Sequence, residues 1–158
     1  MNEKQPKAAL SRKRWTFIAI GSAGLLLTYV FQGYLNIYEL LFGNGSLKMP
    51  YTGTDYLSEG QQTMYVVNKT FRYLLNDIFS ILIIQGIFLK KNYTRFAFML
   101  MAFGLFILLP VYFYIYFLAV PGFSSMISHF HRIVLNPVLM MLLIPALWYQ
   151  ERIQAIRN

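Results

Sequence analysis

The sequence predicts an all-α polytopic membrane protein with four transmembrane helices, and composition is the first reason. Of the 158 residues, 57% are hydrophobic and 18% aromatic, while only 13% are charged. A soluble domain of this length has no core large enough to bury that share of apolar side chains. The other two reasons are the long charge-free segments and the basic residues that gather between them.

Four segments are candidate spans, and they differ in length. Residues 15–38 form a stretch of 24 residues without a charge, and residues 96–128 a stretch of 33. Both exceed the roughly 20 apolar residues that cross a bilayer core as a helix. Residues 133–150 are charge-free for 18 positions, whereas 78–89 manage only 12 and reach spanning length by extending back to residue 71 through Asp77. The second span is therefore the weakest by hydropathy.

The first segment has a competing interpretation as a signal peptide, because basic residues precede its apolar run. The run is longer than an ordinary signal-peptide core, and no clear A-x-A cleavage site follows Gly24. We expect a retained helix. Its small residues offer a face for close packing against another helix, although ordinary small residues facing lipid explain them equally well. They are Ala19, Gly21, Ser22, Ala23 and Gly24.

Charge sets the predicted orientation, since basic residues close to span ends favour the cytoplasmic side. With the N-terminus inside, ten lysines and arginines fall on the cytoplasmic side and four on the outer side. Both termini are thus predicted to be cytoplasmic, and the net charge of +8 adds attraction to anionic membrane lipids. Because these charges flank spans and form no single basic patch, nucleic-acid binding is not expected.

One membrane domain is predicted over residues 1–158. Its parts are a basic cytoplasmic tail (1–14), the first span (15–34), an outer loop (35–69), the second span (70–89), a cytoplasmic loop (90–95), the third span (96–118), an outer loop (119–131), the fourth span (132–149) and a cytoplasmic tail (150–158). The start of the first outer loop, 35–42, is amphipathic and suits the membrane surface. Pro110 and Pro145 predict bends, and the aromatic residues around Tyr112 predict an interfacial belt.

Two stretches share the pattern Arg-x-x-Leu-Asn, and each opens a strongly apolar segment. They are Arg72 to Asn76, followed by Asp77, and Arg132 to Asn136, preceded by His129 and His131. The predicted topology places all of these residues at the outer face, so they are the candidate polar cluster for partner binding or helix packing. An ionisable residue in a span needs a partner, and we expect Asp77 to pair with Arg132 or Arg72.

The second copy of the pattern differs from the first at one position. Pro137 follows Asn136, where Asp77 follows Asn76. Proline disfavours a helical conformation at the residue before it, and Asn-Pro is a good cap and first-turn pair. The alternative to a span that begins at residue 132 is therefore a fourth helix that begins at Asn136-Pro137, with Arg132 in the preceding loop.

The chemistry of the chain points away from an enzyme. It contains no cysteine, which removes thiolate nucleophiles and thiolate metal ligands. The two histidines form only an H-x-H pair, whose members point differently on a helix, and no carboxylates are spaced to converge on a substrate. No catalytic residue, metal or cofactor is predicted.

Residues 70–150 resemble a family of small bacterial membrane proteins associated with exosortase F. The resemblance is carried by Arg72 to Asn76 with the apolar span and basic turn that follow, and by the stretches 132–138 and 143–150. A sister group associated with another type, exosortase X, fits about as well. The resemblance implies an accessory role beside a membrane-embedded sorting peptidase that processes exported proteins at the outer face.

Two functions follow as hypotheses. The first is a non-catalytic accessory protein of the bacterial inner membrane that binds or assists an exosortase or its substrates. The alternative is a small membrane carrier or lipid-binding protein, in which Arg72 and Arg132 hold an anionic head group, because the planar arginine fork donates two hydrogen bonds to a phosphate.

Overall fold

A computed structural model describes residues 7–43, 45, 48, 59–118 and 124–157. Every element in these ranges is helical, which confirms the predicted all-α class. The elements are α1 (Lys7–Val30), η1 (Gln32–Tyr34), α2 (Ile37–Phe42), α3 (Glu59–Phe88), α4 (Lys91–Phe103), the π-helix η2 (Gly104–Leu108), α5 (Leu109–Phe117), α6 (Ser124–Leu135) and α7 (Val138–Arg157).

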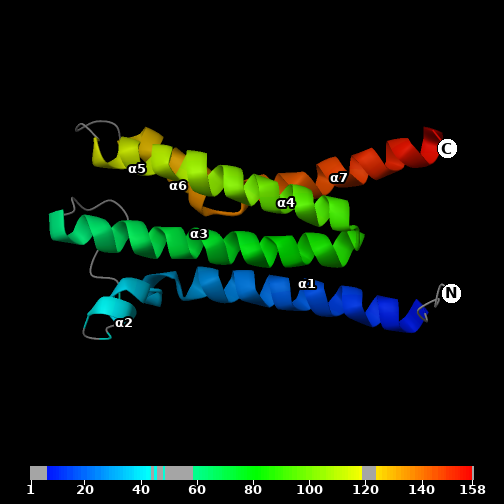
Figure 1. Cartoon of the computed structure of the whole chain (residues 1–158), viewed down its shortest axis with the longest axis horizontal. Helices are drawn as coiled ribbons and strands as arrows, with labels where there is room; N and C mark the ends of the chain where they lie inside the picture. Colours follow the sequence, from blue (N-terminus) through cyan, green and yellow to red (C-terminus); the bar gives the residue numbers. More distant parts are fainter. Residues whose placement is uncertain (1–6, 44, 46–47, 49–58, 119–123, 158) are drawn as a thin grey trace.

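The long helices lie side by side, with α3 at the centre (Figure 1). Helix α1 packs along one side of α3, while α4, η2 and α5 form a nearly continuous rod on the other side, where α6 and α7 also lie. We call the end that holds the start of α1, the α3–α4 turn and the end of α7 the terminal end. The opposite end, with α2 and the start of α3, is the loop end.

Two of these helices are long and apolar enough to cross a membrane without a break, residues 61–88 and 91–117. Two further spans exist if each bent helix pair counts as one. These pairs are 12–30 with 32–42, bent by 66°, and 129–135 with 138–156, bent by 60°. The described residues thus contain between two and four candidate spans, and the segment that was weakest by hydropathy is one of the two unbroken ones.

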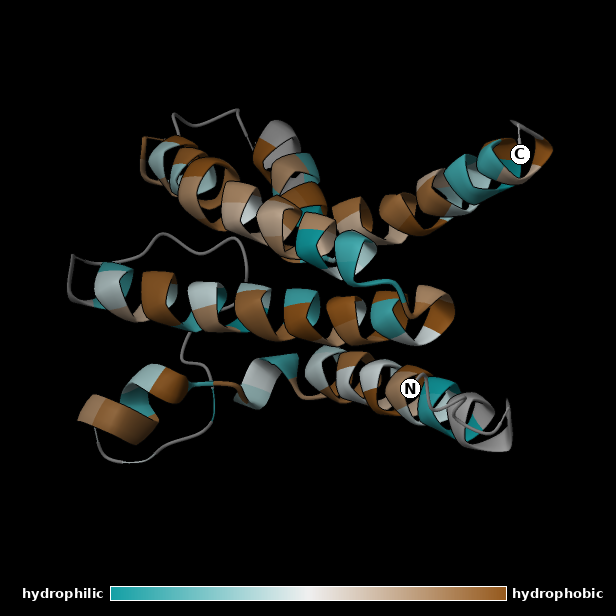
Figure 2. Ribbon diagram, turned by 45° about the vertical axis from the view of Figure 1, so that its right-hand side comes forward, coloured by the Kyte–Doolittle hydropathy of each residue, from teal (hydrophilic) through white to brown (hydrophobic). Residues whose placement is uncertain are grey.

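The apolar surface agrees with a membrane environment. Large hydrophobic side chains are exposed along several helices, including Leu26 at 64%, Met99 at 68% and Phe106 at 75%. A soluble monomer rarely leaves such contiguous apolar surface in water, whereas lipid solvates it. Figure 2 shows the same distribution, with hydrophobic residues prominent along the helices and hydrophilic ones concentrated near the chain ends and on parts of α3.

The helices extend into several segments that the sequence predicted as loops. Hydropathy indicates which residues lie within the membrane, but it does not indicate where a helix ends. Helix α3 begins at Glu59 and not at residue 70, since Lys69 and Arg72 are compatible with helical backbone. The predicted loop 90–95 is mostly the first turn of α4, and α6 occupies part of 119–131. Helix α7 runs to Arg157 through the predicted tail. Residues 49–58 of the first predicted outer loop lie outside the described part of the chain.

The small residues of α1 divide into two faces. Gly21, Gly24 and Thr28 are buried at three- and four-residue spacing, whereas Ala19, Ser22 and Ala23 are exposed. A Cβ atom added at Gly21 would lie 2.6 Å from Ile83 Cγ1 and 2.7 Å from the Phe79 carbonyl oxygen. Gly86 of α3 is equally close to α1, because a Cβ there would lie 2.9 Å from the Arg14 carbonyl oxygen. Glycine therefore sets the close approach of α1 and α3.

Proline is accommodated differently at the two predicted bends. The π-helical turn η2 ends at Leu108, two residues before Pro110, and the Leu109 N–H donates to the Gly104 carbonyl five residues back. A π-turn at this point absorbs the missing proline donor, and residues 91–117 still form one candidate span. Helix α7 continues through Pro145. The sharp break in the last third lies instead at Asn136-Pro137, between α6 and α7.

We predict that widening the α1–α3 contact lowers stability. Gly21→Val and Gly86→Val should each reduce the free energy of unfolding by about 1–3 kcal/mol, because the added methyl groups meet backbone as well as side chains. Thermal unfolding of the detergent-purified protein measures the loss. Gly33→Ala is the matched control, since no atom lies within 4 Å of a Cβ there. Equal melting temperatures for all three variants would contradict this packing role.

Candidate functional site

The two Arg-x-x-Leu-Asn stretches meet at the loop-end side of the α6–α7 break. Arg72 Nη2 donates to Asn136 Oδ1 at 3.4 Å, and Asn76 Nδ2 donates to the Leu135 carbonyl oxygen at 2.9 Å. The break supplies the acceptor, since carbonyl groups at a helix end lack an intrahelical donor. The two stretches therefore belong to one contact between α3 and the α6–α7 break, in which each copy plays a different part. We call it the polar junction.

Arg132 is not a member of this junction. It lies in the last turn of α6 with an exposed side chain, so the predicted loop position is wrong. Helix α6 forms before the Asn136-Pro137 break, because the restriction that proline imposes acts on Asn136 and not on the residues four positions earlier. The exposed residues His129, Arg132 and Ile133 follow the i, i+3, i+4 spacing of one helix face.

Asp77 lies apart from both arginines. Its side chain is only 5% exposed, and the neighbour that acts on its carboxylate is Tyr73, one turn earlier on the same helix. No ion pair between Asp77 and Arg72 or Arg132 occurs among the described residues, whose one salt bridge is at the other end of the bundle. Residues five apart on an α-helix point about 140° from each other, so Arg72 and Asp77 face different neighbours.

Tyr73 connects α3 to the π-turn. Its hydroxyl donates to the Met101 carbonyl oxygen at 3.0 Å, and it lies against Gly104, where an added Cβ would overlap the hydroxyl oxygen. The π-turn interrupts the regular i to i−4 hydrogen bonds of its helix, so a carbonyl beside it can accept a bond from a side chain of α3. Tyr73 thus joins the two unbroken spans, and Asp77 lies one turn further along the same face of α3.

A second group of residues gathers around Tyr112, which is 1% exposed. The Tyr112 hydroxyl lies 2.7 Å from the Tyr65 hydroxyl and 2.8 Å from His131 Nδ1. Tyr65 also stacks on Tyr116, with ring centroids 4.6 Å apart. Instead of forming only an interfacial belt, part of the aromatic segment is therefore a core that holds α3, α5 and α6 together. His131 is fixed by this core, whereas His129 is exposed.

Sequence reasoning overlooked Lys69 as a member of the site. Its side chain is 9% exposed, and Nζ lies 5.2 Å from the centre of the Tyr65 ring. Lys69 and Arg72 are three residues apart on α3, and their charges act on each other. Both charges also act on His131. We call Lys69, Arg72, His131 and Arg132 the basic cluster. The four-residue spacing of Tyr65 and Lys69 on one helix face was the available signal.

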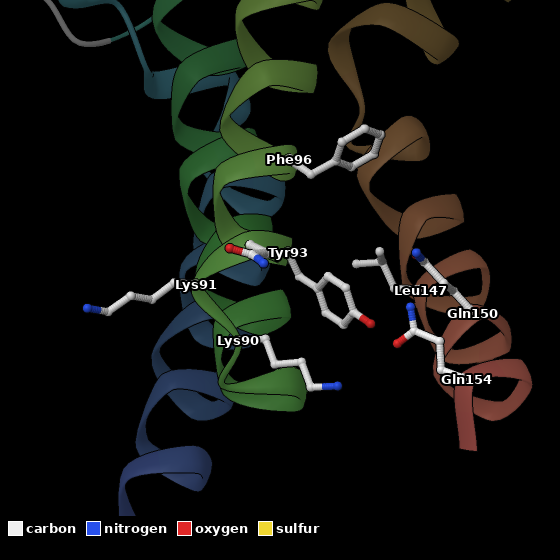
Figure 3. Close-up of a pocket in the computed structure, with 8 residues that line it drawn as sticks. Lys90, Lys91, Tyr93, Phe96, Leu147, Gln150 and Gln154 are labelled. Atoms are coloured by element: carbon white, nitrogen blue, oxygen red, sulfur yellow. The ribbon is translucent and has the colours of Figure 1, made fainter. Parts of the chain in front are cut away.

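At the terminal end, an open cleft of about 680 Å³ lies between the start of α4 and the second half of α7 (Figure 3). Tyr93, Phe96 and Leu147 line its apolar part, and Lys90, Gln150 and Gln154 its polar part. Lys90 Nζ lies 2.5 Å from Glu151 Oε1, and this contact raises the pKa of Lys90. None of the predicted site residues lines this cleft.

No protein-family model, curated protein or solved structure matches this chain.

We predict that Gly104→Ala destabilises the protein by about 1–3 kcal/mol, because the methyl group collides with the Tyr73 hydroxyl. Tyr73→Phe alone should cost about 1 kcal/mol through the lost bond to the Met101 carbonyl. The double variant should be more stable than the sum of the two losses implies, since removal of the hydroxyl makes room. Additive losses in thermal unfolding would show that the two residues do not contact each other.

We also predict that Asp77 and Arg132 act independently. In a double-mutant cycle of Asp77→Ala and Arg132→Ala, the coupling should stay below about 0.5 kcal/mol, as for residues without a shared partner. By contrast, Asp77→Ala and Tyr73→Phe should couple, since the two side chains lie one turn apart on α3 and interact. A coupling energy between Asp77 and Arg132 several times larger than that limit would contradict this prediction and support the ion pair expected from the sequence.

Proposed function

We propose that this chain is a non-catalytic accessory protein of the bacterial inner membrane, with four spans and both termini in the cytoplasm. It binds or assists an exosortase or the exosortase's substrates. The support comes from the resemblance of residues 70–150, from the charge asymmetry between loops, and from the shape of the loop end. In this orientation the loop end faces the outer side, where a sorting peptidase works.

The observation that carries the docking role is the exposed face of α6. Its opposite face is anchored, because Val134 and Leu135 are 4% and 1% exposed and His131 bonds Tyr112. The helix thus holds its exposed residues in fixed positions. That face offers a cation at Arg132, an imidazole at His129 and a half-exposed apolar side chain at Ile133.

A fixed helix face with one apolar and two polar side chains suits a protein partner. The apolar residue supplies buried area, and arginine is among the residues that contribute most to binding at the centre of an interface. The complementary surface on the partner is expected to carry a carboxylate at the membrane boundary. Helix α6 is oriented away from the axis of α7 by the 60° bend at the break, which separates this face from the packed part of the bundle.

The proposal is tested by co-purification from native membranes. Tagged wild-type protein should retain the exosortase encoded by the same organism, whereas Arg132→Glu should lose at least ten-fold of it through charge reversal in the interface. Arg152→Glu is the matched control, because Arg152 is an exposed arginine near the terminal end. Thermal unfolding of each variant establishes that the fold is retained.

Sorting itself provides the second measurement. A clean deletion should leave exported proteins with unprocessed C-terminal signals, and Arg132→Glu should reproduce that defect while Arg152→Glu does not. Normal processing in the deletion strain would overturn the accessory role.

A further inference from the structure

The basic cluster has no acidic counterpart among the described residues. The charged and polar neighbours that act on Lys69 and Arg72 are each other, His131, Asn136 and the tyrosines 29, 65 and 112. Asp77 belongs to the separate Tyr73 contact, and the one described salt bridge joins Lys90 to Glu151 at the terminal end. Within the described part of the chain, Lys69 and Arg72 thus place positive charge in the bundle without a counter-ion.

Hydrogen-bond donors remain available in the cluster. Arg72 Nε is a buried nitrogen atom without a hydrogen-bond partner, and Nη2 reaches only the neutral amide of Asn136 at 3.4 Å. Lys69 is also buried, at 9% exposure, and its described contact is the face of the Tyr65 ring. The free donors of a guanidinium and an ammonium group therefore lie next to each other.

Burying unpaired cations is unfavourable unless an anion or a set of acceptors compensates them. Two cations of the same helix face also repel each other. An oxyanion that accepts hydrogen bonds from both groups removes the two penalties together. Arginine supplies a planar fork for paired oxygen atoms, and lysine supplies a mobile point charge. This donor set suits a phosphate group better than a single carbonyl or hydroxyl.

The depth of the pair in the bundle indicates where the phosphate comes from. Counting back from the end of α3 at Phe88, about 20 helical residues cross the hydrocarbon core and reach Lys69. Lys69 and Arg72 therefore lie where the chain meets the lipid head groups, if the terminal end of α3 marks the other boundary. The exposed apolar side chains of Tyr29 and Val30 at the end of α1 lie on the same side and suit acyl chains.

We propose that Lys69 and Arg72 bind the phosphate group of a membrane phospholipid. The bound lipid completes the junction between α1, α3 and the α6–α7 break. This site is distinct from the exposed face of α6 and does not depend on the exosortase, so either proposal can fail without the other.

The test uses the full chain purified in a neutral detergent and native mass spectrometry. Wild-type protein should retain one phospholipid after detergent exchange, and Lys69→Met and Arg72→Gln should each lower retention at least ten-fold. Arg95→Gln is the matched control, because Arg95 is an exposed arginine of α4 outside the cluster. Equal retention in wild type and in both cluster variants would overturn the proposal.

Melting temperatures distinguish a lipid-binding role of Lys69 from a purely structural one. In lipid-free detergent Lys69→Met should melt at the same temperature as wild type or higher, because it removes an uncompensated buried charge. Adding short-chain phosphatidylglycerol should then raise the melting temperature of wild type only. A large drop for Lys69→Met without lipid would show a structural role and overturn the proposal.

Two controls identify the source of the anion. Inorganic phosphate at the same concentration should shift the melting temperature far less than the phospholipid, since it lacks acyl chains. An equal shift would assign the site to a free anion and overturn the lipid assignment. Tight retention of a protein partner through Lys69 and Arg72, with no phospholipid bound, would assign the cations to a partner's carboxylate instead and would overturn it as well.

Discussion

The burial of the polar side of α3 is the constraint on which the arrangement depends. Five polar residues of this one helix are buried, Asn68, Lys69, Asn76, Asp77 and Ser80. Lipid offers no hydrogen bonds, so each of these groups needs a partner inside the protein. Neighbouring segments supply partners to Asn68 and Asn76, while Ser80 bonds a carbonyl of α3 itself. This requirement is consistent with the central place of α3 among the helices (Figure 1).

Three partners of α3 lie at irregularities in neighbouring segments. Asn68 donates to the side chain of Asn36, the N-cap residue of α2, at 2.8 Å. Tyr73 reaches a carbonyl beside the π-turn, and Asn76 reaches the carbonyl at the end of α6. Breaks in regular helices expose backbone acceptors. The bends, the π-turn and the polar helix are therefore parts of one solution.

The charges do not follow the same pattern. The amide of Asn76 and the hydroxyl of Ser80 are matched within the bundle, whereas no described carboxylate lies against Lys69 or Arg72. A neutral polar group is compensated by one hydrogen bond, but a cation in a low-dielectric site also needs opposite charge. This difference supports anion binding by Lys69 and Arg72, while the exposed face of α6 suits a protein partner.

The sequence by itself determined the helical class, because hydropathy and the exclusion of charge from long segments depend only on composition along the chain. It also identified Arg72, Asn76 and Asn136 as members of one cluster through a repeated pattern. Only the tertiary structure decided the pairing. Asp77 lies against Tyr73 because of helix rotation, Arg132 remains exposed because α6 forms ahead of the break, and Lys69 enters the site because α3 begins eleven residues before residue 70. Rotation, depth and helix ends depend on neighbouring helices, and a linear pattern does not contain them.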